Sequence, residues 1–230
     1  SNEIEIKFND IKNKMEYGIR LYESNSLLIS NNTISNSTDG ISFYHCINES
    51  IFGNLVEFSI NGIIGEKLND SLIQSNKMFN NSQFGLKLKS SWNNSIWKNY
   101  VKDNHFGQAW CDVNDNNWSL FGVGNYWGDY KNIYPNATNN GNVWNQAYLI
   151  NGTSAIFDEF PLVWVIDSNN SSNPPSSDDI PSNDNPLDDT PSSNLGNEYL
   201  TIVIITVGVV GVSIFTVFKV ISFKKRMEMK

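Results

Sequence analysis

Apolar residues in the first half of the chain recur as short alternating pairs, separated by clusters of polar residues. Pairs such as Ile19 with Leu21 and Ile41 with Phe43 indicate strands that bury one face. The segments between them are rich in Asn, Ser, Gly and Asp, which favour turns. Alanine, a frequent residue on the packed faces of helical repeats, is almost missing from this region. The pattern predicts many short strands and no long helix.

This pattern repeats with an even period along the chain. A glycine that precedes an apolar residue recurs at spacings of 22, 22, 23 and 22 residues, at Gly18, Gly40, Gly62, Gly85 and Gly107. An asparagine column keeps the same phase, at Asn9, Asn32, Asn54, Asn76 and Asn99. Two apolar columns accompany it, at Ile11, Ile34, Val56, Met78 and Val101 and at Leu28, Ile51, Leu72 and Ile96. Columns that stay in phase over five units predict a repeat architecture.

The period decides which repeat architecture we expect. Helical repeats need roughly 33 residues or more per unit, and the Leu-x-x-Leu-x-Leu pattern of leucine-rich repeats is not found here. About 22 residues suffice for three short strands and three turns, which form one coil of a parallel β-helix. The sequence therefore predicts an all-β fold, a right-handed parallel β-helix of about five coils over residues 1–122. A C-terminal cap over residues 123–166 would close its end.

The repeated columns are assigned to the scaffold and not to a functional site. We expect the glycines to supply positive φ where a strand meets a turn. The asparagines are expected to form a ladder of amide hydrogen bonds from coil to coil, and the apolar columns to stack in the core. Cys46 and Cys111 lie almost three repeats apart, so we expect them to stay unpaired.

The composition changes sharply after the expected cap. Residues 167–198 are rich in Ser, Asn, Pro and Asp and hold no basic residue, which predicts a disordered stalk. Residues 199–218 carry no charge, which predicts a transmembrane helix over residues 199–223. Lys224, Lys225 and Arg226 favour a cytoplasmic basic tail over residues 224–230. We expect a single-pass protein of the cell membrane whose N-terminal domain is extracellular.

An extracellular domain would expose its Asn-x-Ser/Thr sequons to glycosylation. We expect about half of these sequons to be used, because a chain rich in Asn and Ser also produces sequons by chance. The candidates are Asn31, Asn36, Asn48, Asn69, Asn80, Asn93, Asn117, Asn136, Asn151, Asn169 and Asn170.

Charge and ligand chemistry limit the partners. The formal net charge is −8, so we do not expect nucleic acid as a partner. A copper site needs clustered His, Met or Cys, and His45 and His105 are nearly three coils apart. The loop at 136–144 offers amide oxygens but no carboxylate, which makes it a poor calcium site. We expect no metal site and no cofactor.

The segment after the repeats suggests a family. Residues 124–130 read GNYWGDY and residues 158–163 read DEFPLV. With the Asn-x-Ile and Gly-Ile repeats, over roughly residues 5–165, this arrangement resembles the right-handed β-helix repeat proteins of the NosD-like, periplasmic copper-binding type found on archaeal cell surfaces. The resemblance implies a right-handed parallel β-helix at the cell surface, and it says little about activity.

Aromatic residues gather in the last coils and the expected cap. Their rings would either stack on the faces of sugars or plug the open end of the solenoid, and the sequence leaves both interpretations open. The weak candidates for ligand binding are Trp92, Trp97, Trp110 and Trp118.

Three functions remain open. We favour a membrane-anchored extracellular module for surface recognition or adhesion, with a polysaccharide or a cell-surface protein as ligand and no catalysis in this chain. The alternative is the C-terminal fragment of a carbohydrate-active enzyme, such as a polysaccharide lyase or epimerase, whose catalytic coils lie upstream. Its weak acid–base candidates here are Asp103, His105, Asp112 and Asp115. The third possibility is a structural component of the envelope.

Overall fold

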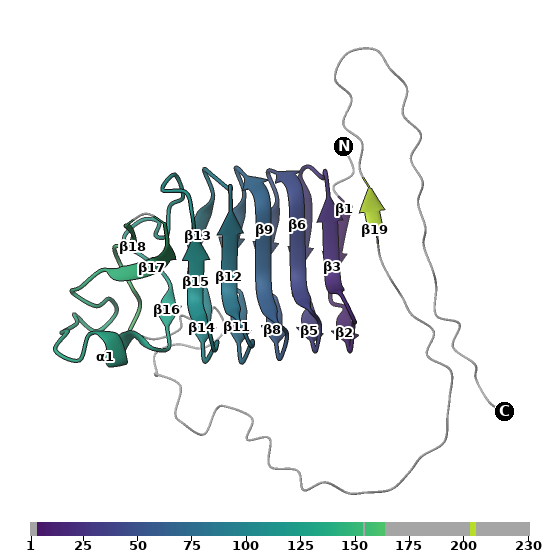
Figure 1. Cartoon of the computed structure of the whole chain (residues 1–230). Helices are drawn as coiled ribbons and strands as arrows, with labels where there is room; N and C mark the ends of the chain where they lie inside the picture. The colour runs from purple at the N-terminus through teal and green to yellow at the C-terminus, as the bar shows by residue number, and fades with distance from the viewer. Residues whose placement is uncertain (1–3, 154, 164–202, 206–230) are drawn as a thin grey trace, which may run out of the picture.

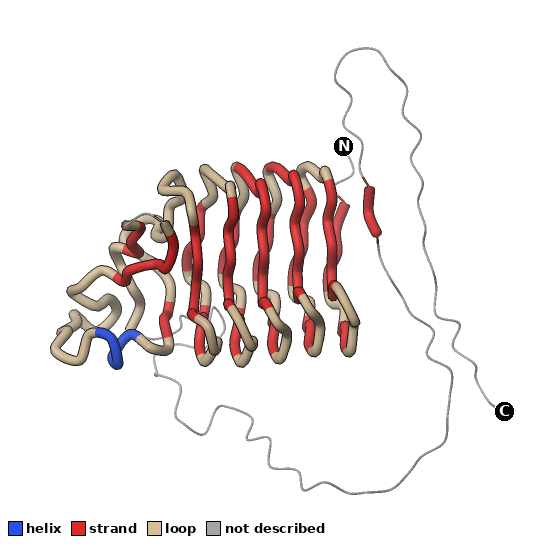
Figure 2. The backbone as a smooth tube through the Cα atoms, viewed as in Figure 1, coloured by secondary structure: helices blue, strands red, loops and turns tan. Residues whose placement is uncertain are grey.

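The chain folds as a parallel β-solenoid. The computed structural model describes residues 4–153, 155–163 and 203–205 of the 230-residue chain. Successive coils stack side by side along one axis (Figure 1), and the strands of each coil are joined by short turns (Figure 2). Each coil contributes one strand to each of three sheets. The predicted all-β parallel solenoid of about five coils is confirmed.

Three sheets, named A, B and C here, run along the solenoid. Sheet A contains β1 (Ile4–Lys7), β4 (Leu27–Ser30), β7 (Ser50–Phe52), β10 (Leu72–Gln74) and β13 (Ser95–Trp97). Sheet B contains β2 (Asp10–Lys12), β5 (Thr33–Ser35), β8 (Leu55–Glu57), β11 (Lys77–Phe79), β14 (Tyr100–Lys102) and β16 (Tyr126–Trp127). The coil strands of sheet C are β3 (Tyr17–Tyr22), β6 (Asp39–Ile47), β9 (Asn61–Asn69), β12 (Phe84–Lys89) and β15 (Gly107–Cys111).

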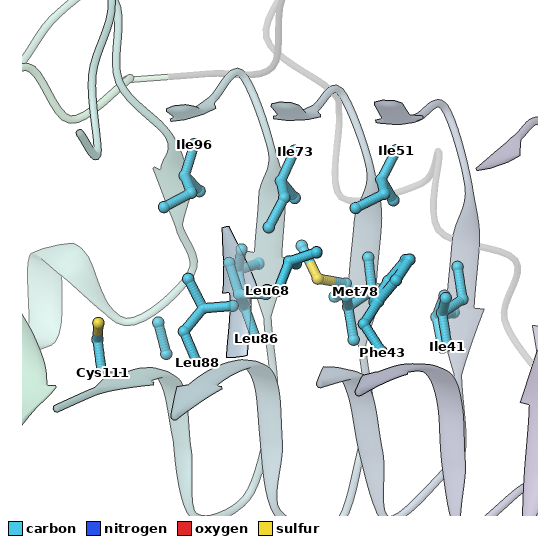
Figure 3. Close-up of a cluster of buried hydrophobic side chains, with 14 of the residues drawn as sticks. Ile41, Phe43, Ile51, Leu68, Ile73, Met78, Leu86, Leu88, Ile96 and Cys111 are labelled. Atoms are coloured by element: carbon cyan, nitrogen blue, oxygen red, sulfur yellow. The ribbon is translucent and has the colours of Figure 1, made fainter. Parts of the chain in front are cut away.

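Inward side chains stack in columns and form the core. The predicted column in sheet B is confirmed, because Ile34, Val56, Met78 and Val101 are aligned and buried, with Ile11 aligned but half-buried at its N-terminal end. In sheet A the buried column runs through Ile6, Ile29, Ile51, Ile73 and Ile96, of which Figure 3 shows the last three in one row. The prediction of Leu28 and Leu72 for this column is wrong by one residue. Both are only half-buried, since a shift of one residue moves a side chain to the other face of a strand.

The reason predicted for the repeated glycines is wrong. None of the five has a positive φ, whereas Gly53, Gly122 and Gly141 do. A Cβ atom on Gly40 would lie 2.1 Å from Cγ1 of Val56 and 2.7 Å from the carbonyl oxygen of Gly62. The column is therefore glycine because core side chains and, at Gly18, Gly40, Gly62 and Gly85, the backbone of the adjacent coil lie too close for a Cβ atom.

The predicted asparagine ladder is confirmed. Asn54 donates from its backbone N and its Nδ2 to Oδ1 of Asn76, at 3.0 and 2.9 Å, and Nδ2 also donates to the carbonyl of Ile29 at 2.9 Å. The same bonds to the next coil recur from Asn9 through Asn32, Asn76 and Asn99 to Asn125. The backbone N–H and one Nδ2 hydrogen bond of each asparagine are directed to the next coil, so the last asparagine needs an acceptor beyond it.

Two further ladders follow the other turns, where the residue type changes from coil to coil and gives no repeated column in the sequence. One joins Ser37, Ser59, Asn81 and Asn104 between sheets B and C. The other joins Glu49, Ser71, Asn94 and Asn116 between sheets C and A. Each ladder satisfies buried backbone N–H groups at a turn, where the sheets offer no partner.

A non-repeating segment follows the last coil. It contains the short helix α1 (Tyr130–Ile133) and the antiparallel pair β17 (Tyr148–Gly152) and β18 (Ile156–Asp158). The buried carboxylate of Asp158 accepts hydrogen bonds from the backbone N of Asn125 at 2.7 Å and from Nε1 of Trp127 at 2.9 Å. Burial raises the pKa of Asp158 to about 7, against the opposing effect of these hydrogen bonds. Asp158 is thus the terminal acceptor of the asparagine ladder.

Most of the predicted C-terminal organisation lies outside the described residues. This holds for the stalk (167–198) and the basic tail (224–230). Of the predicted transmembrane helix (199–223), the structure describes only β19 (Val203–Ile205), which pairs in parallel with β3. The span therefore stays a prediction. Within the described part of the chain, no helix has both the length and the apolar content needed to cross a bilayer.

Candidate functional site

Sheet C has the longest coil strands, and its outward side chains form rows across the coils. Strand register aligns Arg20, Ser42, Ile64, Lys87 and Trp110 in one row. A second row, two residues further along each strand, holds Tyr22, Tyr44, Glu66 and Lys89. Neighbouring members of a row are roughly 4.8 Å apart, which is the spacing of paired strands. We call the surface made by these nine residues the sheet C face.

Aromatic rings and cations are paired on and beside this face. The Lys87 ammonium lies 5.6 Å from the ring centroid of Trp110 and 5.6 Å from that of Phe84. The rings of Tyr22 and Tyr44 stack with their centroids 5.2 Å apart. A cation within about 6 Å of an aromatic face is attracted to it, so Lys87 and its two rings hold each other in place.

The sheet C face is positively charged although the chain is acidic. Among its nine residues Arg20, Lys87 and Lys89 are cationic and Glu66 is anionic, which gives +2 against −8 for the whole chain. Glu66 forms an ion pair with Lys89, with 3.1 Å between its Oε1 and the Lys89 Nζ. Asp39 lies beside the face, and burial raises the pKa of its carboxyl group. A hydrogen bond from Asn61 and the nearby charges of Lys87 and Arg20 act in the opposite direction and lower this pKa. Since Glu66 pairs with Lys89, Arg20 and Lys87 carry the net positive charge of these nine residues, with Asp39 close to both.

A hollow lies where the chain turns from sheet C to sheet A. Glu23, His45, Lys67 and Ser90 occupy equivalent positions in successive coils, with φ of 49°, 55°, 56° and 46°. The residues after them, Ser24, Cys46, Leu68 and Ser91, are buried. The next residues, Asn25, Ile47, Asn69 and Trp92, reach the surface again. A hollow of about 370 Å³ lies between the column that holds His45 and the column that holds Ile47. We call it the corner hollow, and its lining residues are His45, Cys46, Ile47, Lys67, Asn69 and Trp92.

The four candidate tryptophans do not form one site. Trp110 lies half-exposed on the sheet C face, and Trp92, which is 44% exposed, lines the corner hollow. Trp97 lies on β13 of sheet A, where the Lys98 ammonium is 4.4 Å from its ring centroid.

Trp118 belongs to the interior of the C-terminal segment. It is 2% exposed, and its ring lies 6.0 Å from that of Trp127. Trp127 in turn stacks on Tyr148 at 4.4 Å. The buried position of Trp118 agrees with a ring that plugs the end of the solenoid and not with one that stacks on a sugar.

The acid–base candidates lie at the two opposite ends of β15 (Gly107–Cys111). Asp103 and His105 lie on the turn before this strand, and Asp112 and Asp115 lie after it. Five residues of strand separate the two pairs by roughly 16 Å. Asp103 pairs with Lys102 at 3.5 Å, and Asp112 accepts the backbone N–H of Ser90 at 2.7 Å. The structure therefore does not bring the four groups together.

Most candidate sequons are at the surface. The exposed ones are Asn31, Asn36, Asn48, Asn80, Asn93, Asn117, Asn136 and Asn151. Asn69 is half-buried, and its Oδ1 accepts the backbone N–H of Trp92 at 3.1 Å. Asn169 and Asn170 lie outside the described residues. Glycosylation of any of them stays a prediction.

Several sequons arise from the turn geometry itself. Asn31, Asn36, Asn48, Asn80 and Asn93 all have positive φ, and each directly precedes a buried residue of one of the ladders. Asn tolerates this left-handed conformation better than most residues, and the strand that follows each turn begins near a Ser or Thr.

The described residues offer little to a metal ion. They contain no group of three or more His, Cys, Asp or Glu side chains that would hold one. In the loop at 136–144, Oδ1 of Asn139 and Oδ1 of Asn140 accept backbone N–H groups of Gly141 and Val143, both at 2.9 Å. Cys46 and Cys111 are buried free thiols, which confirms that they are unpaired.

The family comparison agrees with this architecture. The family model described as periplasmic copper-binding protein (NosD) matches residues 1–156. The chain belongs to the NosD family. This confirms the resemblance seen in the sequence, and the periplasmic or extracellular type of the NosD family agrees with the expected extracellular domain. No curated protein and no solved structure matches the chain.

Proposed function

We propose that this NosD-family chain is a recognition module that binds a polysaccharide through the sheet C face. The observation that supports this most directly is the position of the Lys87 ammonium, 5.6 Å from the rings of both Trp110 and Phe84. Aromatic faces stack on the apolar faces of sugars, and cations donate hydrogen bonds to their hydroxyl and carboxylate oxygens.

The solenoid suits a polymeric ligand. Rows of the sheet C face continue over several coils, so successive sugar units would meet equivalent positions along the rod. Strands of a ladder-stabilised sheet also hold these side chains in place before binding, which reduces the entropy lost on association. A cell-surface protein remains the alternative ligand.

The proposal includes a place at the membrane. The uncharged stretch 199–218 and the basic residues after it support a C-terminal anchor, with the polar segment 167–198 as a spacer between the bilayer and the solenoid. The sheet C face would then be presented to the outside of the cell.

Copper binding, which the family's description names, is not part of the proposal. Copper needs several His, Met or Cys ligands in one place. Cys46, Cys111 and Met78 are buried in different coils, and Nε2 of His45 is occupied by the Lys67 ammonium at 2.9 Å. The donor set among the described residues therefore does not fit the ion.

The test is binding of the full chain to immobilised neutral and acidic polysaccharides, with analysis of the polymer for shortening. Trp110→Ala is expected to weaken binding about tenfold, and Phe121→Ala, which removes a ring that is 88% exposed elsewhere, should leave it unchanged. Shortened polymer would favour the enzyme alternative. Binding to none of the polysaccharides would contradict the proposal and favour a structural role.

A further inference from the structure

We infer that the corner hollow is a subsite for the carboxylate of an acidic sugar, so that the ligand is a uronate-containing polysaccharide. This inference rests on the proposed function and names the class of polymer that would bind. It is carried by three residues that line the hollow together, His45, Lys67 and Trp92.

Lys67 supplies a cation without an acidic partner. No carboxylate of the described residues lies within salt-bridge distance of its ammonium. Two nearby acids are already engaged, because Glu66 pairs with Lys89 and Asp70 accepts a hydrogen bond from Asn93. An ammonium has three donors, and the contact with His45 uses one of them. The other donors are available to an incoming carboxylate.

His45 holds Lys67 in position. Its Nε2 lies 2.9 Å from the Lys67 Nζ and acts as the acceptor when the ring proton is on Nδ1. The imidazole packs against the ring of Tyr44, with centroids 4.4 Å apart. Both residues lie within β6 and β9, and the pairs on either side of them, Tyr44 with Glu66 and Cys46 with Leu68, are in register, which sets their separation. A preorganised cation of this kind favours an anionic ligand.

Trp92 supplies an apolar wall to the same hollow. Trp92 is 44% exposed, and its backbone N–H donates to Oδ1 of Asn69 at 3.1 Å. Ile47, which is 41% exposed, adds an apolar surface. The volume of about 370 Å³ is within the range of small-molecule sites and would accommodate one sugar unit. An aromatic wall beside a cation matches the two sides of a uronate, its apolar ring face and its carboxylate.

The experiment compares polygalacturonate with its fully methyl-esterified form, which keeps the sugar backbone and removes the charge. The full chain is produced without N-glycosylation, so that no glycan at Asn48, Asn69 or Asn93 covers the hollow. The variants are Lys67→Met and Trp92→Ala. Their matched controls are Lys12→Met, which removes the same charge from sheet B, and Phe58→Ala, which removes a similarly exposed ring from the turn between sheets B and C.

We expect the acidic polymer to bind at least tenfold more tightly than its ester, with Lys67→Met removing this preference. Trp92→Ala should weaken both polymers about tenfold, and the two controls should change neither. Equal binding of acid and ester, or binding that both corner variants leave intact, would overturn the inference while leaving the proposed function in place. Failure of every polysaccharide to bind the unmodified chain would overturn both.

Discussion

The carboxylate of Asp158 accepts the indole N–H of Trp127 at 2.9 Å while it also accepts the backbone N–H of Asn125 at 2.7 Å. One buried acid thus joins the end of the asparagine ladder to the aromatic packing of the C-terminal segment. The backbone N–H and one Nδ2–H of each ladder asparagine are directed towards this end, so a carboxylate is well suited to receive the last pair from Asn125. The relationship leads to predictions about what stabilises the scaffold that carries the sheet C face.

Removal of one amide from the ladder should be costly. Asn76 is buried, its Oδ1 accepts two bonds from Asn54, and its Nδ2 donates to Asn99 and to the carbonyl of Ile51. Asn76→Ala leaves these groups without partners, so we expect a loss of about 3 kcal/mol in the free energy of unfolding. Urea unfolding followed by tryptophan fluorescence measures it. Asn132→Ala, on the exposed side of α1, should cost under about 0.5 kcal/mol, and equal losses would contradict a special role for the ladder.

Stability should fall as the pH rises through the range from about 4 to about 7. Burial raises the pKa of Asp158 from 3.8 to about 7 and that of Glu49 from 4.5 to about 7. The folded chain therefore binds more protons than the unfolded chain in this range, so the contribution of both groups is greatest below it and is lost as the pH rises through the folded pKa. The full shifts correspond to about 4 kcal/mol for Asp158 and about 3 kcal/mol for Glu49.

Unfolding free energies at pH 5 and pH 8 test this dependence. Asp158→Asn and Glu49→Gln should each remove about half of the difference, whereas Glu159→Gln, at an exposed neighbouring position, should keep all of it. Greater stability at pH 8 than at pH 5 in the unmodified chain would contradict the assignment.

The repeated glycines should tolerate no side chain. In Gly40→Ala the new Cβ meets Val56 and the carbonyl of Gly62, so we expect more than about 4 kcal/mol of destabilisation and little folded protein. Gly122→Ala is the comparison, because Gly122 has a φ of 75° and open space around it. That change should cost only about 1 kcal/mol of backbone strain. Circular dichroism of the two variants distinguishes crowding from conformational strain.

Substitution of Trp118 should affect stability, whereas substitution of Trp110 should affect polysaccharide binding. Trp118 is buried against Trp127, so Trp118→Ala should lower the free energy of unfolding by about 3–5 kcal/mol. Trp110→Ala should leave stability nearly unchanged and weaken polysaccharide binding. Parallel measurements of unfolding and binding on both variants check this, and weaker binding of a stably folded Trp118→Ala chain would contradict the separation.

Much of the scaffold was predictable from the sequence because the repeat copies each local environment. The column from Asn32 to Asn99 was visible because one residue type recurs at every coil. The ladder that contains Glu49 and Ser71 has the same spacing but changes residue type, so its members look like ordinary turn residues. The glycine column was also visible in the sequence, but the reason expected for it, a positive φ, was wrong. The actual reason is the lack of space for a Cβ atom, and sequence alone does not show how closely adjacent coils approach.

The site was harder to predict than the scaffold. Asp158 lies 33 residues beyond Asn125 in a segment without a repeat, so no periodicity points to their contact. Trp92 and Trp110 were among the candidates, but so were Trp97 and Trp118, and only strand register and burial place them on different surfaces. The corner hollow was missed, although His45 and Lys67 lie 22 residues apart, one coil of the repeat.

Oxidative footprinting of the tryptophans in the full chain, with and without saturating polygalacturonate, tests the central claim most directly. Bound polymer is expected to protect Trp110 on the sheet C face and Trp92 in the corner hollow, with no change at Trp97 on sheet A. An unchanged pattern, or protection of Trp97 while Trp92 and Trp110 stay reactive, would contradict recognition through this side of the solenoid.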